Sequence, residues 1–357
     1  MRFSIALLAL SLSATQAQVI PLSNRHEGEA AVRRAMLWLQ QRQHEEGHWS
    51  SPQWPALTAL PVWALSMDEE FRDTDSVRRG VAFIKSTAHP NGAIFVEPRE
   101  ERRGGGLSMY NTAISMVGLH MSGIEDARPY VLRAREFVAA AQHLSGDVFH
   151  GGFGYDAATN RAYADLSNTF IAIEGMVLTQ DVEDLRTEGE RVDFDREAAV
   201  QFVSSIQNRR ESNPAEWVSD HPEDAGGFAY RPEDSRGMIR VTADGKEAFR
   251  TFGSMTYAGK LSLIYSDVDR NDPRVQSAFE WSRRNWTVSS NPPADQEGFF
   301  YFINVLSKSM ATFGRNIFTR TTGEEVNWRV EVINELVGRQ RIDEHGNGFW
   351  LNDNNRY

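Results

Sequence analysis

The sequence predicts an all-helical protein of the α/α toroid class, in which hairpins of one outer and one inner helix stack into a ring. Two observations lead to this expectation. One unit recurs through the 357 residues: an amphipathic helix, a glycine-containing turn that closes on an aromatic residue, and an apolar helix rich in small residues. The chain is also 41% hydrophobic, which is enough to bury a large core. Repeats of this kind bury their apolar faces against one another, and closing the stack gives a ring.

Amphipathic segments precede the turns and are expected to form the outer layer. Their apolar residues recur at helical spacing, and Asp195 and Asp272 precede two of them as expected N-caps. The six turns are Gly47-His48-Trp49, Gly92-Ala93-Ile94-Phe95, Gly151-Gly152-Phe153, Gly226-Gly227-Phe228, Gly298-Phe299-Phe300 and Gly346-Asn347-Gly348-Phe349-Trp350. The six expected outer helices are Glu29–Gln43, Val77–Ser86, Tyr130–His143, Phe194–Asn208, Pro273–Asn285 and Trp328–Arg341.

The intervening segments carry few charges and many Ala, Gly, Ser and Thr residues. A helix that is apolar on nearly all sides is buried on nearly all sides, so these segments are expected to form the inner layer. The five expected inner helices are Pro55–Met67, Leu107–Ser122, Ala164–Leu178, Gly253–Tyr265 and Gly298–Phe313. The sequence stops after the sixth turn, where a sixth inner helix is expected.

Two long connections interrupt the repeat, at residues 144–163 and 209–252. Connections of the second length are usually functional or mobile. The stretch from Met238 to Gly245 has strand-like content and ends in Asp-Gly, which predicts a short hairpin within the second connection.

The N-terminus has the pattern of a secretory signal. Arg2 is followed by an apolar run from Ile5 to Leu12 and by small residues from Ala14 to Ala17. The run is shorter than the roughly 20 residues that span a bilayer, so residues 1–17 are predicted to be a cleaved signal peptide rather than a transmembrane span. Residues 18–357 are then a single exported domain, with the periplasm or the extracellular space as its destination.

The composition excludes several functions. A net charge of −11 would repel nucleic-acid phosphates, so nucleic acid is not an expected partner. The chain has no cysteine, which excludes disulfides, a thiol nucleophile and any zinc site that contains cysteine. His120, His143 and His150 show no recognisable ligand spacing. We therefore expect neither a metal site nor a cofactor.

The repeat resembles that of the squalene cyclase and prenyltransferase superfamily over roughly residues 26–357. In the triterpene cyclases of that superfamily a glutamine in an outer helix joins the Gly–aromatic turn and ties adjacent hairpins together. The matching glutamines here are Gln40, Gln43, Gln142, Gln207 and Gln340. The stretches around residues 165–169, 252–259 and 271–275 resemble a subgroup of secreted bacterial squalene-cyclase-like proteins more closely.

The resemblance implies a specific acid, and the sequence departs from it. Triterpene cyclases protonate an alkene with an Asp-x-Asp-Asp-Thr motif, and the matching segment here is Asp165-Leu166-Ser167-Asn168-Thr169. The position of the family's proton donor is Ser167, whose hydroxyl is far too weak an acid for this step. Asp165 is left as a weak candidate acid, and the alternative interpretation is that it caps an inner helix.

Polar residues on the inner helices are the candidates for lining a central cavity. The structural alternative for each is a buried polar group whose hydrogen bonds are satisfied between helices. The candidates are Tyr110, Asn111, Ser167, Asn168, Glu174, Tyr257, Lys260, Tyr301, Asn304 and Lys308. The acidic stretch Asp267–Asp272 lacks the glycine and distal glutamate of a calcium loop, so we interpret it as a solvated turn ending in a helix cap.

Two functions remain open at this stage. One is a terpenoid cyclase-like enzyme that does not use the standard acid. The other is a non-catalytic toroid that acts as a scaffold or binds an apolar isoprenoid, a lipid or a protein partner. A third, polysaccharide cleavage, rests on fold analogy alone, because the inner helices offer only Asp165 and Glu174 as a carboxylate pair on one helix.

Overall fold

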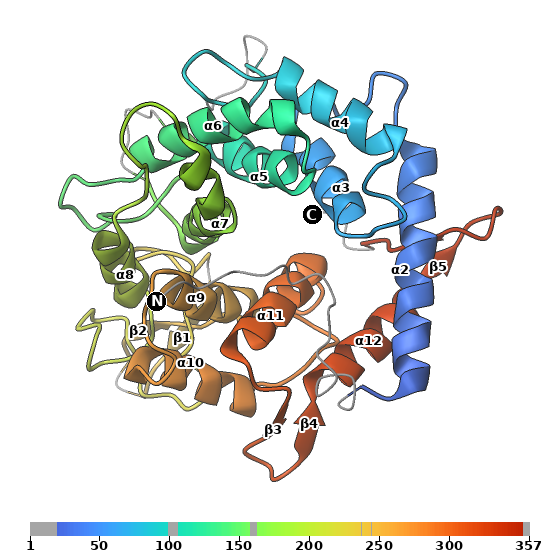
Figure 1. The fold of residues 1–357 in the computed structure, drawn as a ribbon. Helices are drawn as coiled ribbons and strands as arrows, with labels where there is room; N and C mark the ends of the chain where they lie inside the picture. The colour runs from blue at the N-terminus through green and yellow to red at the C-terminus, as the bar shows by residue number, and fades with distance from the viewer. Residues whose placement is uncertain (1–19, 99–105, 158–162, 237, 244, 353–357) are drawn as a thin grey trace.

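The computed structural model describes residues 20–98, 106–157, 163–236, 238–243 and 245–352. The predicted signal peptide lies outside these residues. The described chain is mostly helical, as predicted, and the helices form two layers (Figure 1). The outer layer consists of α2 (Leu22–Arg42), α4 (Asp75–Ser86), α6 (Arg128–Ala140), α8 (Arg196–Ser205), α10 (Pro273–Arg284) and α12 (Trp328–Arg339). The inner layer consists of α3 (Ala56–Ser66), α5 (Ser108–Met121), α7 (Leu166–Leu178), α9 (Gly253–Tyr265) and α11 (Phe299–Phe313).

The inner helices pack against one another in chain order, from α3 to α11, and the last outer helix, α12, packs against the first, α2. Close approach between inner helices depends on small residues, as expected. A Cβ added at Gly118 of α5 would lie 2.8 Å from the Ala59 carbonyl oxygen of α3. One added at Gly175 of α7 would lie 3.1 Å from the Ala113 carbonyl oxygen of α5.

Four of the six Gly–aromatic turns share one geometry. Their first glycine has a positive φ, and a Cβ added there would collide with a backbone carbonyl of the next outer helix. These glycines and the facing carbonyls are Gly47 with Arg79, Gly92 with Arg133, Gly151 with Ala198, and Gly226 with Ser277. The turn therefore lies directly on the next hairpin, which is why glycine recurs there.

The other two turns differ from the prediction. Gly298 is the N-cap of α11 and faces no carbonyl of an outer helix, so the fifth copy has no turn of this kind. In the sixth copy, Gly346 lies between β5 (Arg341–Ile342) and β6 (Gly348–Phe349), a short hairpin that packs on α2. Phe349 stacks on Trp38 of α2 at 5.5 Å between ring centroids.

The glutamines tie successive repeats together, as the resemblance implies. Gln142 Nε2 donates to the Gly151 carbonyl at 3.0 Å and to the Asp195 carbonyl, before α8, at 2.9 Å. Gln43 and Gln207 make the same pair of bonds in their repeats. Gln340 Nε2 donates to the Ala31 carbonyl of α2 at 2.8 Å, so this tie joins the last repeat to the first.

A threonine near the start of four inner helices provides a second tie. Its hydroxyl accepts a hydrogen bond from the backbone N–H of the residue that closes the preceding turn. The pairs are Trp49 with Thr58, Ile94 with Thr112, Phe153 with Thr169, and Phe228 with Thr256. Thr169 therefore has a structural role that it shares with three other repeats.

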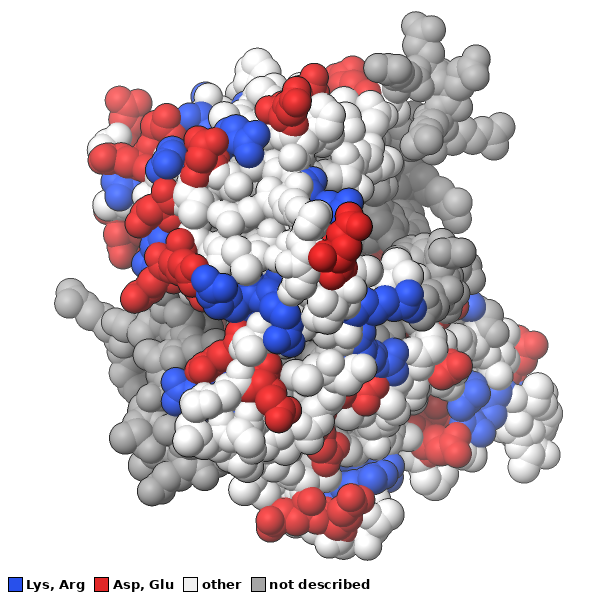
Figure 2. All heavy atoms as spheres, turned by 90° about the vertical axis from the view of Figure 1, so that its right-hand side faces the viewer, with Lys and Arg blue, Asp and Glu red and all other residues white. Residues whose placement is uncertain are grey.

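The predicted helix boundaries agree closely with those observed, except that α2 begins at Leu22 rather than Glu29. The first turns of α2 lack an apolar stripe, so the sequence pattern missed them. In the structure these turns contact α12, where Asn24 Nδ2 donates to Asn334 Oδ1 at 2.6 Å. Acidic and basic side chains are interspersed on the side of the molecule where α2 lies (Figure 2), and α2 contributes the ion pairs Arg25–Glu29 and Arg33–Glu70.

Three short antiparallel hairpins interrupt the helices. The predicted hairpin in the second long connection is present, with β1 (Ile239–Val241) paired to β2 (Glu247–Phe249). A second hairpin of β3 (Ile317–Thr319) and β4 (Glu325–Asn327) separates α11 from α12 and was not predicted. The third is the hairpin β5–β6. The caps expected at Asp195 and Asp272 are confirmed, since each accepts a hydrogen bond from a backbone N–H of its helix.

Candidate functional site

The two long connections lie at the N-terminal ends of α5 and α7. The Tyr155 carbonyl accepts from the Met109 N–H of α5 at 3.0 Å, and the Tyr230 carbonyl accepts from the Leu166 N–H of α7 at 3.0 Å. Each connection thereby satisfies backbone donors that a helix start leaves free. This arrangement brings tyrosines from both connections next to Asp165.

Asp165 is fully buried and caps α7. Its Oδ1 accepts from the Asn168 backbone N–H at 2.9 Å. Its Oδ2 accepts from Asn168 Nδ2 at 2.7 Å, from the Tyr163 hydroxyl at 2.7 Å and from the Tyr230 hydroxyl at 2.9 Å. Both oxygens of the Asp165 carboxyl group therefore already accept hydrogen bonds from neighbouring residues.

The repeat itself does not require an aspartate at this position. In the other three repeats, the position four residues before the tying threonine holds Trp54 just before α3, Ser108 at the start of α5, or Phe252 just before α9. A cap alone would be served by serine, as well as by aspartate. Asp165 and its tyrosines are thus specific to the α7 repeat, which makes this cluster the leading candidate site.

Five tyrosines surround the carboxylate: Tyr110, Tyr155, Tyr163, Tyr230 and Tyr301. Burial and the nearby Asp165 raise the pKa of Tyr163 and Tyr230. Burial, with smaller contributions from Tyr155 and Asp165, raises the pKa of Tyr110 to about 12. These phenols therefore stay protonated at neutral pH and act as hydrogen-bond donors. The sequence analysis named Tyr110 and Tyr301 but missed the three loop tyrosines, which only the folded loops bring to Asp165.

Four buried polar atoms on α7 and α11 have no hydrogen-bond partner among the described residues: the Tyr301 hydroxyl, Asn168 Oδ1, Glu174 Oε1 and Ser309 Oγ. Burial raises the pKa of the Tyr301 hydroxyl, and Tyr110, Glu174 and Asp165 add to the effect. The orphaned hydroxyl therefore lies within electrostatic reach of both carboxylates. Buried polar atoms without partners are uncommon and mark places where a further polar group can bind.

Glu174 and Lys308 form an ion pair between α7 and α11. Lys308 Nζ lies 2.9 Å from Glu174 Oε2 and 4.5 Å from the centre of the Trp63 ring on α3. One lysine therefore contacts side chains from two other inner helices. This pair was among the alternatives expected from the sequence.

The remaining candidates occupy other environments. Asn111 is buried, accepts from the Ala56 N–H at 3.1 Å and donates to the Gly106 carbonyl, so it joins α3 to the start of α5. Ser167 is half-buried, and Asn304 is exposed on α11. Tyr257 is fully buried among side chains that include Trp281 of the outer helix α10 and Phe302 of α11.

Lys260 lies apart from the Asp165 cluster, fully buried between α9, α10 and α11. Its ammonium group faces the rings of Tyr257, Phe279 and Phe313 at 5.2, 5.5 and 5.0 Å, and its Nζ lies 3.5 Å from Met310 Sδ. Burial lowers the pKa of Lys260 to about 7. Cation–π attraction offsets only part of the desolvation of the charged form.

Replacing Lys260 with methionine is therefore expected to stabilise the fold, by on the order of 1–4 kcal/mol at pH 7. The pKa is 10.5 in the unfolded chain and about 7 in the fold, so the cost of burying the charge is fully present below pH 7. Stability should rise between pH 7 and about 10.5 as the unfolded chain loses its extra proton. Urea denaturation across this range should show the rise in the wild type and its loss in Lys260→Met.

The control is Lys85→Met, which removes a partly exposed lysine paired with Asp126 at 2.8 Å. It is expected to change stability by less than about 1 kcal/mol and to keep the pH-dependent rise. A Lys260→Met protein less stable than the wild type at pH 7 would contradict this account.

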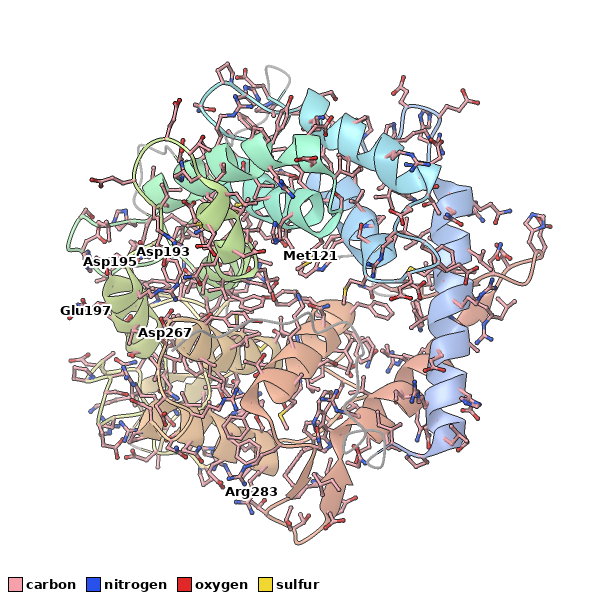
Figure 3. All side chains as sticks on the ribbon, viewed as in Figure 1. Met121, Asp193, Asp195, Glu197, Asp267 and Arg283 are labelled. Carbon is pink, nitrogen blue, oxygen red and sulfur yellow. The ribbon has the colours of Figure 1, made fainter. Side chains whose placement is uncertain are left out.

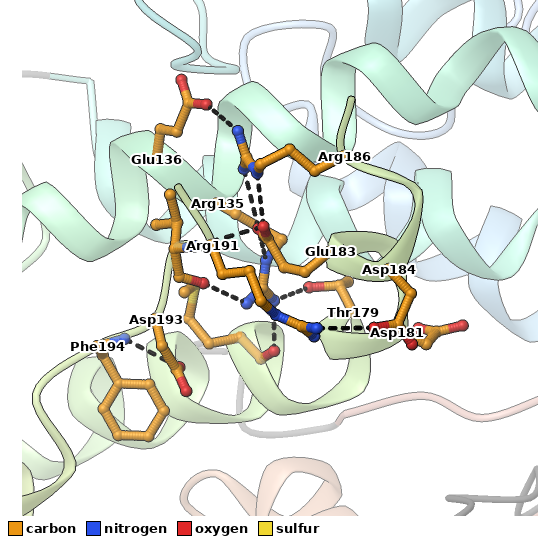
Figure 4. Close-up of polar contacts among 12 residues, drawn as sticks. Arg135, Glu136, Thr179, Asp181, Glu183, Asp184, Arg186, Arg191, Asp193 and Phe194 are labelled. Atoms are coloured by element: carbon orange, nitrogen blue, oxygen red, sulfur yellow. Dashed lines mark hydrogen bonds and ion pairs between the residues drawn. The ribbon is translucent and has the colours of Figure 1, made fainter. Parts of the chain in front are cut away.

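A second buried polar cluster surrounds Arg135 of α6 (Figure 4). Its guanidinium donates to Glu183 Oε1 at 2.7 Å, to Thr179 Oγ1 at 2.8 Å and to the backbone carbonyls of Met176 and Val192. Arg186 pairs with both Glu183 and Glu136 at 2.6 Å. The cluster joins α6 to the short helix η2 (Gln180–Leu185) and the segment after it, so its role is structural.

Acidic residues also gather on the outside of the molecule. Asp193, Asp195, Glu197 and Asp267 lie around α8 on the left of the view in Figure 3. Asp267 pairs with Arg196 at 3.4 Å, and Asp272 caps α10. This agrees with the interpretation of residues 267–272 as a turn and cap.

An open polar groove of about 530 Å³ lies on the outer surface, between residues 208–226 and α10. Its arginines already have partners: Arg210 pairs with Asp220, Arg209 with Glu211, and Arg284 donates to the Pro222 carbonyl. None of the site candidates selected from the sequence lines this groove. We therefore assign it no chemistry.

None of the described helices is both long and apolar enough to cross a membrane. No protein-family model and no curated protein matches the sequence. Among solved structures, a similar chain is a variant of the type II terpene cyclase MstE from Scytonema, determined with its product merosterolic acid A. The TM-score is 0.53 at 11% sequence identity, over 93% of this chain and 84% of the other. This similarity establishes a fold like that of the terpene cyclases.

Proposed function

We propose that this protein is an exported α/α toroid that binds an apolar isoprenoid or lipid molecule among its inner helices and does not protonate an alkene. The single observation that carries the proposal is the hydrogen bonding of Asp165. It is the one residue that could replace the missing cyclase acid, and it accepts hydrogen bonds from four donors.

An alkene-protonating acid must hold a proton and point it at the substrate. Both carboxyl oxygens of Asp165 instead accept hydrogen bonds from Asn168, Tyr163 and Tyr230, so the group is directed at its neighbours and not at a substrate. Glu174, the other carboxyl group on α7, is paired with the Lys308 ammonium group. Neither carboxyl group is thus suited to starting a cyclisation by protonation.

Binding is supported by one face of α3. Leu60 and Met67 are exposed, at 46% and 44%, and they share a helix face with Trp63 at spacings of three and four residues. Trp63 meets Lys308 of α11, so this apolar face looks toward α11. Exposed apolar surface of this kind on an inner helix marks a binding surface. The unpartnered Tyr301 hydroxyl and Asn168 Oδ1 would then contact a polar end of the ligand.

In this proposal, the six outer and five inner helices of the described residues form the toroid. The similarity to a terpene cyclase fits an apolar ligand, and residues 1–17 have the pattern that directs export. Membership in a secreted squalene-cyclase-like subgroup is part of this proposal. A cyclase-like enzyme is the second candidate, favoured by the same fold similarity.

The test is titration of the purified mature chain with squalene and with a long-chain polyprenol, followed by quenching of tryptophan fluorescence and by product analysis. Binding without any cyclised product is expected. Leu60→Glu places a charge on the apolar face and should weaken binding about tenfold or more. Leu144→Glu is the matched control, because Leu144 is 54% exposed but belongs to a connecting loop; it should bind as the wild type does.

Cyclised product from the wild type would overturn the proposal in favour of the enzyme. Equal binding by the wild type and Leu60→Glu, or no binding of either ligand, would also contradict it. If Ser167→Asp combined with Asn168→Asp gains turnover, the pocket is cyclase-like and only the acid has been lost.

A further inference from the structure

The first Gly–aromatic turn brings three possible metal ligands together. His44, Glu46 and His48 each offer one donor atom, and these donor atoms all lie within 4.8 Å of one another. No other group of three His, Asp or Glu residues in the described ranges has such an arrangement. The sequence analysis considered His120, His143 and His150 and overlooked this turn.

The turn holds the two imidazoles face to face. The His44 N–H donates to the His48 carbonyl at 2.9 Å, and the Gly47 N–H donates to the His44 carbonyl at 2.9 Å, which closes a tight turn. The His44 and His48 rings consequently stack at 4.4 Å between centroids with an interplanar angle of 14°. For both rings to bind one ion the exposed His44 ring must turn, because the nitrogen lone pairs of stacked rings lie in parallel planes.

His48 supplies an independent indication of a ligand. It is only 5% exposed, packs on Phe83 of α4 at 5.2 Å, and its Nδ1 is buried without a hydrogen-bond partner in the described chain. Its Nε2 lies 3.7 Å from Glu46 Oε2. A buried imidazole nitrogen is normally hydrogen-bonded, so a partnerless Nδ1 on a ring whose Nε2 faces a carboxylate is uncommon in a purely structural turn.

We propose that His44, Glu46 and His48 bind a divalent transition-metal ion of the zinc class. Two imidazoles and one carboxylate are ligands that such ions prefer, whereas magnesium and calcium prefer oxygen ligands alone. Ligands about 2 Å from a tetrahedral ion lie closer together than 4.8 Å, so binding requires a small inward movement. His44 and Glu46 are exposed and free to make it, while His48 is held by α4. The exposure of His44 and Glu46 leaves the fourth position to water.

The sequence His44-Glu45-Glu46-Gly47-His48 also has the H-E-x-x-H spacing of zinc metalloproteases. In those enzymes the two histidines lie one turn apart on a helix, but here they face each other across a turn that follows α2. The catalytic glutamate of that motif would be Glu45, which is not part of the ligand group. The proposed ion therefore stabilises the turn and has no assigned catalytic role.

The experiment is isothermal titration of the purified chain with zinc chloride, together with thermal unfolding with and without zinc. The wild type should bind one ion and unfold at a higher temperature when zinc is present, because the ion binds the folded state. Loss of an outer-shell partner costs a metal site about 10–100-fold in affinity, so losing a ligand in His44→Ala or Glu46→Gln should cost at least about tenfold. Both side chains are exposed, so neither variant threatens the fold.

His345→Ala is the matched control. His345 occupies the corresponding turn of the sixth repeat and lies 3.7 Å from Glu344, but that turn has no second histidine. The control should bind zinc as the wild type does. Zinc binding that survives both His44→Ala and Glu46→Gln, or that is lost in His345→Ala, would overturn the proposal, as would a wild type that binds no zinc.

Discussion

Replacing Arg135 with leucine is expected to lower the free energy of unfolding by about 3 to 5 kcal/mol. Arg135 is fully buried, and its guanidinium donates to a carboxylate, a hydroxyl and two backbone carbonyls. Leucine would remove the donor that the Thr179 hydroxyl and the carbonyls of Met176 and Val192 share, and Glu183 would keep only one of its two arginines, Arg186. Chemical denaturation of the wild type and the variant measures the difference.

The control for this prediction is Arg128→Leu on the same helix. Arg128 is about half exposed and pairs with Glu125 at 3.4 Å, so its loss should cost less than about 1 kcal/mol. The double variant Arg135→Leu with Glu183→Leu should recover part of the stability, because it also removes the buried carboxylate that has lost one of its two arginines. Equal losses of unfolding free energy in Arg135→Leu and Arg128→Leu would show that the buried cluster stabilises the fold no more than an exposed ion pair does.

The same cluster gives a dependence on acid pH. Burial raises the pKa of Glu183, but hydrogen bonds from Arg186 and Arg135 outweigh it and hold the pKa at about 2, compared with 4.5 in the unfolded chain. The stabilisation by Glu183 is therefore fully present above pH 4.5 and is lost as the pH falls from 4.5 toward 2. Denaturation at several pH values should show this loss in the wild type and a smaller loss in Glu183→Gln.

Replacing Gly151 with alanine is expected to be the most damaging change among the repeat turns. Gly151 has a φ of +89°, and a Cβ there would lie 1.8 Å from the Ala198 carbonyl oxygen of α8. An L-residue in the left-handed region costs about 1–2 kcal/mol, and overpacking adds about 1–3 kcal/mol or more. The backbone of α8 must move to make room, which also strains the Gln142 bonds to Gly151 and Asp195.

Gly146→Ala separates the two contributions. Gly146 belongs to the same connection and has a φ of +76°, but a Cβ there would meet nothing within 4 Å. Its replacement should cost only the backbone strain of about 1–2 kcal/mol. Thermal unfolding of both variants decides the point: similar losses would mean that contact between the turn and the next outer helix does not limit stability.

The helical layers could be predicted from the sequence because their signals are local. Apolar spacing separates outer from inner helices, and the repeated glycine and glutamine mark the turns and their ties. The turn predicted at Gly298 was wrong because a glycine followed by aromatic residues can also cap and begin a helix, as in α11. The hairpin β3–β4 was missed because its turn, residues 320–324, lacks the Asp-Gly pair that marked the hairpin β1–β2.

The candidate site was only partly predictable. Asp165, Asn168, Tyr110 and Tyr301 were selected because polar residues on apolar helices need an explanation. Tyr155, Tyr163 and Tyr230 could not be assigned, since they lie in long connections whose path no periodicity defines. His44 and His48 were overlooked because their spacing has meaning only once the chain turns between them.

The sequence by itself determined the layered, mostly helical architecture and the repeat ties, and through the resemblance it predicted that Ser167 replaces the family's proton donor. These follow from residue identity and near-neighbour spacing along the chain. Only the tertiary structure decided the hydrogen-bond partners of Asp165, because two of its donors come from residues 163 and 230. Likewise, only the fold showed which of the two carboxyl groups on α7 meets a lysine. These contacts depend on distances in space, and the sequence alone does not contain them.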